Sequence, residues 1–249
     1  MEAHKIQAKN LVKIYGRRKV VDDLSMEMNQ GEVVGILGPN GAGKTTTFYM
    51  ILGLAKPNRG KVLLDGRDIT HQPMYRRARL GLGYLAQAPS IFAKLSVRDN
   101  IMAILQTLKL SRQERKERLE SALEELNLTS LAKQKAYTLS GGERRKLEIT
   151  RSLVTKPTFI FMDEPFAGVD PIAVADIQDI INKLREKNIG VMLTDHNVIE
   201  TLKIVNRAYI IFEGKIIVSG SSLELINDEQ AKKLYLGERF LSNPFEPQS

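Results

Sequence analysis

The chain has 249 residues, 43% of them hydrophobic and 27% charged, a size that suits one large α/β domain with room for a subdomain. It contains no cysteine, which excludes disulfides and thiolate metal sites, and it shows neither a secretory signal nor an apolar run near the ~20 residues that span a bilayer, so we expect a cytosolic protein. The net charge of +8 favours a solvated basic surface first, anionic lipid headgroups second and nucleic acid last.

The first thirty-odd residues are predicted to form strands. Apolar and polar residues alternate over residues 5–8, 11–15 and 24–28, as in half-buried strands. The second of these carries Tyr15, which by itself is an ordinary strand aromatic. A turn at 29–31 then leads into a short buried strand at 32–37.

A phosphate-binding loop is predicted next. The pattern G-x-x-x-x-G-K-[ST] is matched at the residues Gly38, Pro39, Asn40, Gly41, Ala42, Gly43, Lys44, Thr45 and Thr46. A helix is predicted over 46–52. Gly41 and Gly43 let several backbone N–H groups face one phosphate, and the helix adds its positive end. Lys44 would lie between the β- and γ-phosphates, and the Thr45 hydroxyl would bind Mg²⁺. The alternative is a glycine-rich turn with a chance lysine.

The middle of the chain alternates short strands with a helical segment. A turn at 57–60 precedes a strand at 61–66, and a strand at 81–87 ends at Gln87, a loop residue unless it faces a metal or water. Residues 97–153 have helical periodicity, and Ser111 with Glu114 fits a capping box. We expect a helical subdomain inserted between two sheet-forming halves.

A second capping box, Ser140 with Glu143, places Gly141 and Gly142 in the first turn of a helix that runs to about residue 154. A helix start with serine and glycine can bind an anion through its free N–H groups. A plain capped helix is the alternative.

Two acids follow the most apolar strand of the chain. The run over residues 158–164 begins with Thr158, is apolar throughout 159–162 and ends in Asp163 and Glu164. Such an apolar run is typical of a central parallel strand. Ligands of such sheets bind at the carboxyl ends of the strands. We therefore expect Asp163 beside Mg²⁺ and Glu164 beside the attacking water.

The last third continues the alternation of helices and strands. Asp170 and Pro171 predict a helix start, and residues 190–196 form a strand that ends at His196, a candidate γ-phosphate contact. A hairpin is predicted over 209–218 and a helical segment over 222–236, with a frayed end after residue 242.

Together these motifs resemble those of the ATP-binding subunits of ABC transporters over nearly the whole chain. The matching features, in family order, are the adenine-stacking Tyr15, Walker A at 38–46, the Q-loop Gln87, the signature LSGGE at 139–143, Walker B at 159–163 with its base Glu164, the D-loop at 168–170 and the switch histidine His196. Longer matches at 38–50, 89–100, 163–171, 194–197 and 235–238 are similar to the ATPases of lipopolysaccharide export. Branched-chain amino-acid importer ATPases are the nearest alternative.

The resemblance implies a fold. It is an α/β P-loop NTPase core with an antiparallel β subdomain, residues 1–88 and 154–236. A helical subdomain with the signature motif, residues 89–153, is inserted into it, and residues 237–249 form a C-terminal tail.

It also implies a Mg²⁺-dependent ATPase whose two copies sandwich two ATP molecules. Ser140, Gly141 and Gly142 of one copy would face the γ-phosphate held by the other, with Asp170 at the shared interface. Mg²⁺ would be held by Thr45, Gln87 and Asp163. Glu164 would polarise the attacking water, and Gln87 and His196 would sense the γ-phosphate.

The resemblance implies membrane partners as well. Transmembrane subunits would dock near Gln87–Asn100, through Ile91 and Phe92 if these are exposed, and would hold the chain at the cytoplasmic face of the inner membrane. A soluble ABC-type mechanochemical ATPase is disfavoured because the inserted helical segment is short and the chain has one cassette, so no nucleic acid is expected. A non-catalytic regulatory binder is disfavoured because Glu164 and Ser140–Gly142 are intact.

Overall fold

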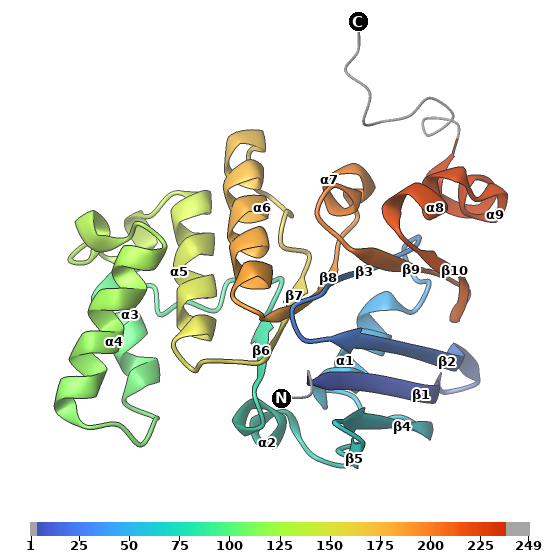
Figure 1. Ribbon diagram of the computed structural model, residues 1–249, viewed down its shortest axis with the longest axis horizontal. Helices are drawn as coiled ribbons and strands as arrows, with labels where there is room; N and C mark the ends of the chain where they lie inside the picture. The colour runs from blue at the N-terminus through green and yellow to red at the C-terminus, as the bar shows by residue number, and fades with distance from the viewer. Residues whose placement is uncertain (1–3, 238–249) are drawn as a thin grey trace, which may run out of the picture.

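A computed structural model describes residues 4–237, which form two β-sheets and their covering helices (Figure 1). The four-stranded antiparallel sheet has the order β2-β1-β4-β5 and contains β1 (Lys5–Tyr15), β2 (Arg18–Asn29), β4 (Arg59–Leu64) and β5 (Arg67–Asp68). The six-stranded sheet has the order β10-β9-β3-β8-β7-β6, with β10 antiparallel to the rest; it contains β3 (Val33–Leu37), β6 (Leu82–Leu85), β7 (Phe159–Asp163), β8 (Gly190–Thr194), β9 (Arg207–Phe212) and β10 (Lys215–Gly220). The predicted α/β fold class is confirmed.

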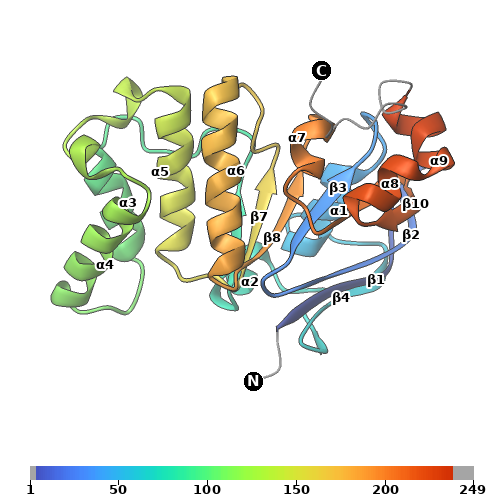
Figure 2. The same cartoon turned by 45° about the horizontal axis from the view of Figure 1, so that its top comes forward.

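The helices gather in three places (Figures 1 and 2). α1 lies between the two sheets, α3, α4 and α5 lie together at one end, and α6, α7 and α8 cover the other face of the six-stranded sheet. Their bounds are α1 Lys44–Leu52, α2 Met74–Arg79, α3 Val97–Leu105, α4 Arg112–Glu125, α5 Gly141–Leu153, α6 Pro171–Glu186, α7 Val198–Leu202, α8 Ser222–Asn227 and α9 Glu229–Ala231, followed by a π-helix at Lys232–Leu236. Within residues 4–237, no helix combines the length and apolar character needed to cross a bilayer.

The central strands divide their side chains between two cores. β3, β7 and β8 are buried over their full length. Phe159 and Phe161 of β7 join the core around α1, whereas Ile160 and Met162 join the core beneath α5 and α6, because successive side chains of a strand point to opposite faces. With both faces covered, the carboxyl ends of these strands remain as the place for a ligand.

Three local predictions differ from the structure. Residues 5–8 and 11–15 form one strand, β1, whose pairing is interrupted by bulges around Asn10 at φ 50°. Gly60 was predicted in a turn but belongs to β4, where at φ 88° a side chain would collide with the carbonyl oxygen of Asn10. Helix α2 was not predicted, and the predicted frayed end after residue 242 lies outside the described residues.

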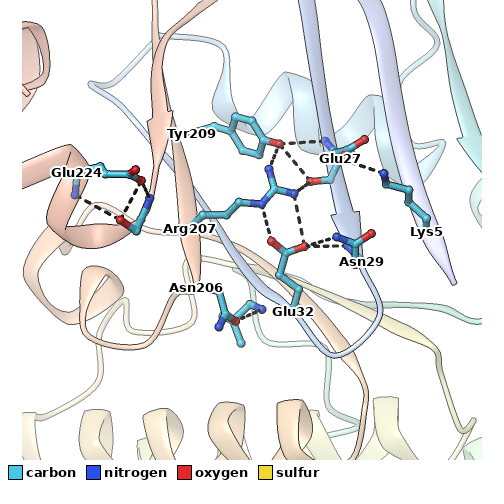
Figure 3. Close-up of polar contacts among 10 residues, drawn as sticks. Lys5, Glu27, Asn29, Glu32, Asn206, Arg207, Tyr209 and Glu224 are labelled. Carbon is cyan, nitrogen blue, oxygen red and sulfur yellow. Dashed lines mark hydrogen bonds and ion pairs between the residues drawn. The ribbon is translucent and has the colours of Figure 1, made fainter. Parts of the chain in front are cut away.

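An arginine joins the two sheets at the end opposite the phosphate loop (Figure 3). The Arg207 guanidinium pairs with the Glu32 carboxylate, donates to the Tyr209 hydroxyl and donates to the carbonyl of Glu27 at 2.6 Å. Burial opposes the charge of Arg207, but the hydrogen bonds and charges of Glu32 and Tyr209 together outweigh burial and raise the pKa of Arg207. The network therefore fixes β9 to β2 and to the turn before β3.

A second arginine closes the end of α1. Arg77 of α2 is 0% exposed and donates to the carbonyls of Gln72, Met50, Ile51 and Thr70. These include the last carbonyls of α1, which have no partner inside the helix. Burial lowers the pKa of Arg77 to about 10, although the charge of Asp68 opposes this shift.

We expect Arg77→Met to lower the free energy of unfolding by about 2–4 kcal/mol, because the methionine leaves buried carbonyls without donors. Urea denaturation followed by circular dichroism measures the change. Arg76→Met is the matched control, since Arg76 lies on the same helix and is exposed. Equal stability of the two variants would contradict the role given to Arg77.

Candidate nucleotide site

The phosphate loop is held in shape by close backbone contacts. A side chain on Gly38, at φ 145°, would collide with the carbonyl oxygen of Ile211, and one on Gly43, at φ 106°, would lie 2.5 Å from that of Val20. The turn between β9 and β10 holds the loop directly, since the Gly214 N–H donates to the Ala42 carbonyl at 2.9 Å. Glycine is thus required at positions 38 and 43 because the neighbouring backbone leaves no room for a side chain.

The loop lysine lies next to both strand-end acids. Lys44 Nζ donates to the carbonyls of Gly38 and Pro39 at 2.6 and 2.9 Å. Partial burial lowers the pKa of Lys44, and the nearby charges of Glu164 and Asp163 oppose this shift. Beside Lys44, Thr45 is exposed in the first turn of α1.

The two acids after β7 have different environments. Asp163 is 2% exposed, and its Oδ1 accepts a hydrogen bond from the Thr194 hydroxyl at 2.7 Å. Glu164 has the left-handed backbone conformation at φ 46°, and its N–H donates to the carbonyl of Thr194 at 2.8 Å. Positive φ is unusual for glutamate, and the hydrogen bond to Thr194 of β8 helps to hold the backbone in this conformation.

Two residues from other loops, Gln87 and His196, lie at the Glu164 carboxylate. Gln87 Nε2 donates to Glu164 Oε2 at 2.6 Å, and His196 Nδ1 lies 3.6 Å from the same oxygen. The His196 and Glu164 side chains are 63% and 27% exposed. The structure therefore brings Gln87, Glu164 and His196 together at the carboxyl ends of β6, β7 and β8, beside Lys44 and Asp163.

Asp195 was missed by the sequence analysis. It is 0% exposed; its Oδ2 accepts from the Phe166 N–H at 3.0 Å and its Oδ1 from the Asn197 N–H at 2.8 Å. The carboxylate thus ties the loop after Glu164 to the loop that carries His196. An acid directly after an apolar strand, as at Asp163, was the available signal.

Tyr235, also unassigned by the sequence analysis, reaches the same site from the C-terminal π-helix. It packs partly buried against the larger core. Burial raises the pKa of its hydroxyl, which faces the backbone of Gly38 and the carboxylate of Asp195.

The signature residues lie elsewhere. Ser140 and Glu143 form the predicted capping box at the start of α5, with Gly141 exposed between them. In Figures 1 and 2, α5 lies on the far side of α6 from α1, and within residues 4–237 no hydrogen bond joins 140–142 to the phosphate loop. Asp170 is exposed and caps α6 through the Ala173 N–H at 3.0 Å.

Tyr15 ends β1 and is 53% exposed. Lys13 Nζ lies 4.9 Å from the centre of its ring. The ring therefore has a face available for stacking.

The segment after Gln87 rests on α5. Arg145 Nη1 donates to the Ala86 carbonyl at 3.1 Å and to Glu148 at 2.9 Å, while Glu148 accepts from the Ser90 N–H at 3.1 Å. Ile91 packs against the core, whereas Phe92 is 45% exposed.

Known proteins resemble this chain in sequence and in fold. A family model described as "ABC transporter" matches residues 21–167. Proteins named lipopolysaccharide export system ATP-binding protein LptB are 55% identical in Acidithiobacillus ferridurans and 51% in Escherichia coli K12, each alignment covering 94% of this chain and 98% of the relative. The crystal structure of the ADP conformation of MJ1267, an ATP-binding cassette of an ABC transporter, has a TM-score of 0.85 at 30% identity, covering 94% of this chain and 99% of that one.

Proposed function

The chain belongs to the ABC transporter family of ATP-binding proteins, and from this membership we propose that it is the motor subunit of a transporter that exports lipopolysaccharide. It is an ABC-type ATPase, and ATP is its nucleotide. The observation that carries the catalytic assignment is the Glu164 carboxylate, held by Gln87 at 2.6 Å beside His196. The cargo is inferred from relatives that are 51–55% identical over 94% of the chain.

We assign the hydrolytic step to the residues at the carboxyl ends of β6, β7 and β8. Glu164 orients the attacking water and accepts its proton, while Gln87 and His196 hold that carboxylate and face the γ-phosphate. Lys44 and the N–H groups of residues 38–46 bind the phosphates. Asp195 is a positioning residue, since its bonds fix the two loops that carry Glu164 and His196.

The donor set fits Mg²⁺. Within the described part of the chain no cluster of three or more histidines and acids forms a complete metal site, but Mg²⁺ at phosphate sites needs only one or two protein oxygens together with phosphates and waters. The protein oxygens would come from the side chains of Thr45, Asp163 and Gln87. Gln87 would use its side-chain oxygen, since its side-chain nitrogen Nε2 already donates to Glu164. When bound, the ion would neutralise phosphate charge.

We propose that the working unit is a head-to-tail homodimer. Ser140, Gly141 and Gly142 stand at a helix start where Ser140 and Gly141 are exposed, and within residues 4–237 they make no hydrogen bond to the phosphate loop of their own subunit. Such a helix start is free to bind the phosphate held by a partner copy. ATP would then favour association, because it bridges the two copies, and hydrolysis would release them. We assign residues 89–153 to the helical subdomain of this unit, and the described part of residues 1–88 together with residues 154–236 to its core.

We place the transmembrane subunits on the segment Gln87–Asn100, at the cytoplasmic face of the inner membrane. Phe92 is the exposed anchor, with Arg151 4.7 Å from the centre of its ring. Asn100 fixes the main chain of Phe92 in both directions, accepting from its N–H at 2.8 Å and donating to its carbonyl at 3.0 Å. A rigid aromatic on a preformed surface is typical of an interface hot spot.

We expect Phe92→Ala to weaken association with the membrane subunits by roughly 10-fold or more, because a buried aromatic anchor contributes about 2 kcal/mol or more to binding, while ATP affinity stays unchanged. Leu223→Ala is the matched control, since Leu223 on α8 is 63% exposed and lies outside the segment. Co-purification yields measure association and nucleotide titration measures affinity. Equal yields for both variants would exclude this docking site.

The partners themselves test the cargo. Affinity purification of the tagged chain from its native membranes, followed by mass spectrometry, should recover membrane subunits of lipopolysaccharide export. Amino-acid importer permeases would overturn the cargo and leave the ATPase assignment intact. Soluble partners without any membrane protein would overturn the transporter assignment.

A further inference from the structure

A cavity of about 610 Å³ lies beside the phosphate loop. It is lined by the loop itself, by the turn between β9 and β10, and by the first residues of β2; the segments are 39–42, 212–214 and 18–20. None of the β2 residues belongs to a motif of the sequence analysis. Its lining includes Arg18, which is the register partner of Tyr15 at the end of β1.

Arg18 lies at the junction of the base site and the phosphate site. It pairs directly with Tyr15 in the register of β1 and β2. Its Nη2 lies 4.0 Å from the position that a Cβ would occupy on Gly41. The backbone pairing therefore holds Arg18 beside Tyr15, and its side chain extends to the phosphate loop at Gly41.

The charge of Arg18 has no partner of opposite sign among residues 4–237, whereas its neighbour Lys19 pairs with Asp22 at 2.9 Å. The same end of the loop already holds Lys44 and the N–H groups that begin α1. The cavity itself is lined by Arg18, by Lys19 and by one acid, Glu213. A guanidinium without an ion-pair partner at such an opening is stabilised by an anion. An arginine fork suits phosphate oxygens in particular, because it can donate two parallel hydrogen bonds.

We propose that Arg18 is a nucleotide-binding residue that contacts the polyphosphate between the base stacked on Tyr15 and the loop at Gly41. The proposal rests on the ATP site described above and adds a residue to it. Such a contact lies away from the attacked phosphorus and is the same before and during hydrolysis. We therefore expect its loss to raise KM and leave kcat nearly unchanged.

The test compares Arg18→Ala with Arg17→Ala. Arg17 is exposed in the same turn and carries the same charge but does not line the cavity. Calorimetric titration of the wild-type chain and both variants with ATP and with ADP gives the affinities. We expect Arg18→Ala to bind both nucleotides about 10-fold more weakly, since a hydrogen bond to a charged group contributes about 1.5–3 kcal/mol, and Arg17→Ala to bind within about twofold of wild type.

Two results would overturn the proposal: wild-type affinity in Arg18→Ala, or equal losses in both variants, which would indicate a general effect of surface charge. A steady-state measurement adds an independent readout, because a drop in kcat without a rise in KM would also contradict a binding role. Failure of the wild-type chain to bind ATP would instead overturn the proposed function.

Discussion

Glu164→Gln is expected to slow ATP hydrolysis by roughly 10²–10⁴-fold while ATP binding persists. The amide has nearly the same shape as the carboxylate but cannot accept a proton from the attacking water. Glu164 is held by Gln87 and its backbone by Thr194, so the variant should keep the geometry of the site. Because the bridging nucleotide is no longer cleaved, ATP should also trap the dimer.

Phosphate release measures the rate, and size-exclusion chromatography with ATP measures the dimer. Glu186→Gln is the matched control, since Glu186 is an exposed glutamate at the end of α6. Wild-type turnover in Glu164→Gln would show that another group activates the water. Slow turnover without an ATP-trapped dimer would leave the base in place and contradict the proposed sandwich.

Lys44→Ala is expected to act one step earlier, on nucleotide binding itself. Without nucleotide, the ammonium satisfies the carbonyls of Gly38 and Pro39, and partial burial lowers its pKa. Phosphate oxygens would replace those carbonyls with charge-assisted bonds that favour the protonated lysine. Loss of such bonds, at about 1.5–3 kcal/mol each, corresponds to roughly 10- to 100-fold weaker ATP binding.

Calorimetric titration with ATP tests this expectation. Lys61→Ala is the matched control, because Lys61 is an exposed lysine of β4 whose ion pair with Asp68 is long, at 4.0 Å. Undiminished ATP affinity in Lys44→Ala would remove Lys44 from the phosphate site. A loss in both variants would point to net charge instead of the loop.

The parts of the site that the sequence predicts are those encoded locally. The phosphate loop is a contiguous pattern, and the boxes Ser111–Glu114 and Ser140–Glu143 span one helical turn each. The position of Asp163 follows from the length of an apolar strand, because a strand buried on both faces must end where polar residues begin. These features need no knowledge of distant residues.

The parts that it misses depend on partners far along the chain. Arg77 reaches carbonyls 26 and 27 residues away, and Arg207 pairs with Glu32 across 175 residues. In the sequence each is one basic residue among 37. The direction of Arg18 likewise depends on the register between β1 and β2, which bulges in β1 shift more than once.

Lipopolysaccharide extraction by the assembled transporter tests the proposed motor function. The ATPase is purified with its membrane subunits, reconstituted into proteoliposomes that contain lipopolysaccharide, and assayed for lipopolysaccharide leaving the bilayer when ATP and Mg²⁺ are added outside. We expect ATP-dependent extraction with the wild-type chain, and extraction slowed by roughly 10²–10⁴-fold, like hydrolysis, with Glu164→Gln. Steady ATP hydrolysis by the wild-type complex with no release of lipopolysaccharide would show that this ATPase does not drive lipopolysaccharide export.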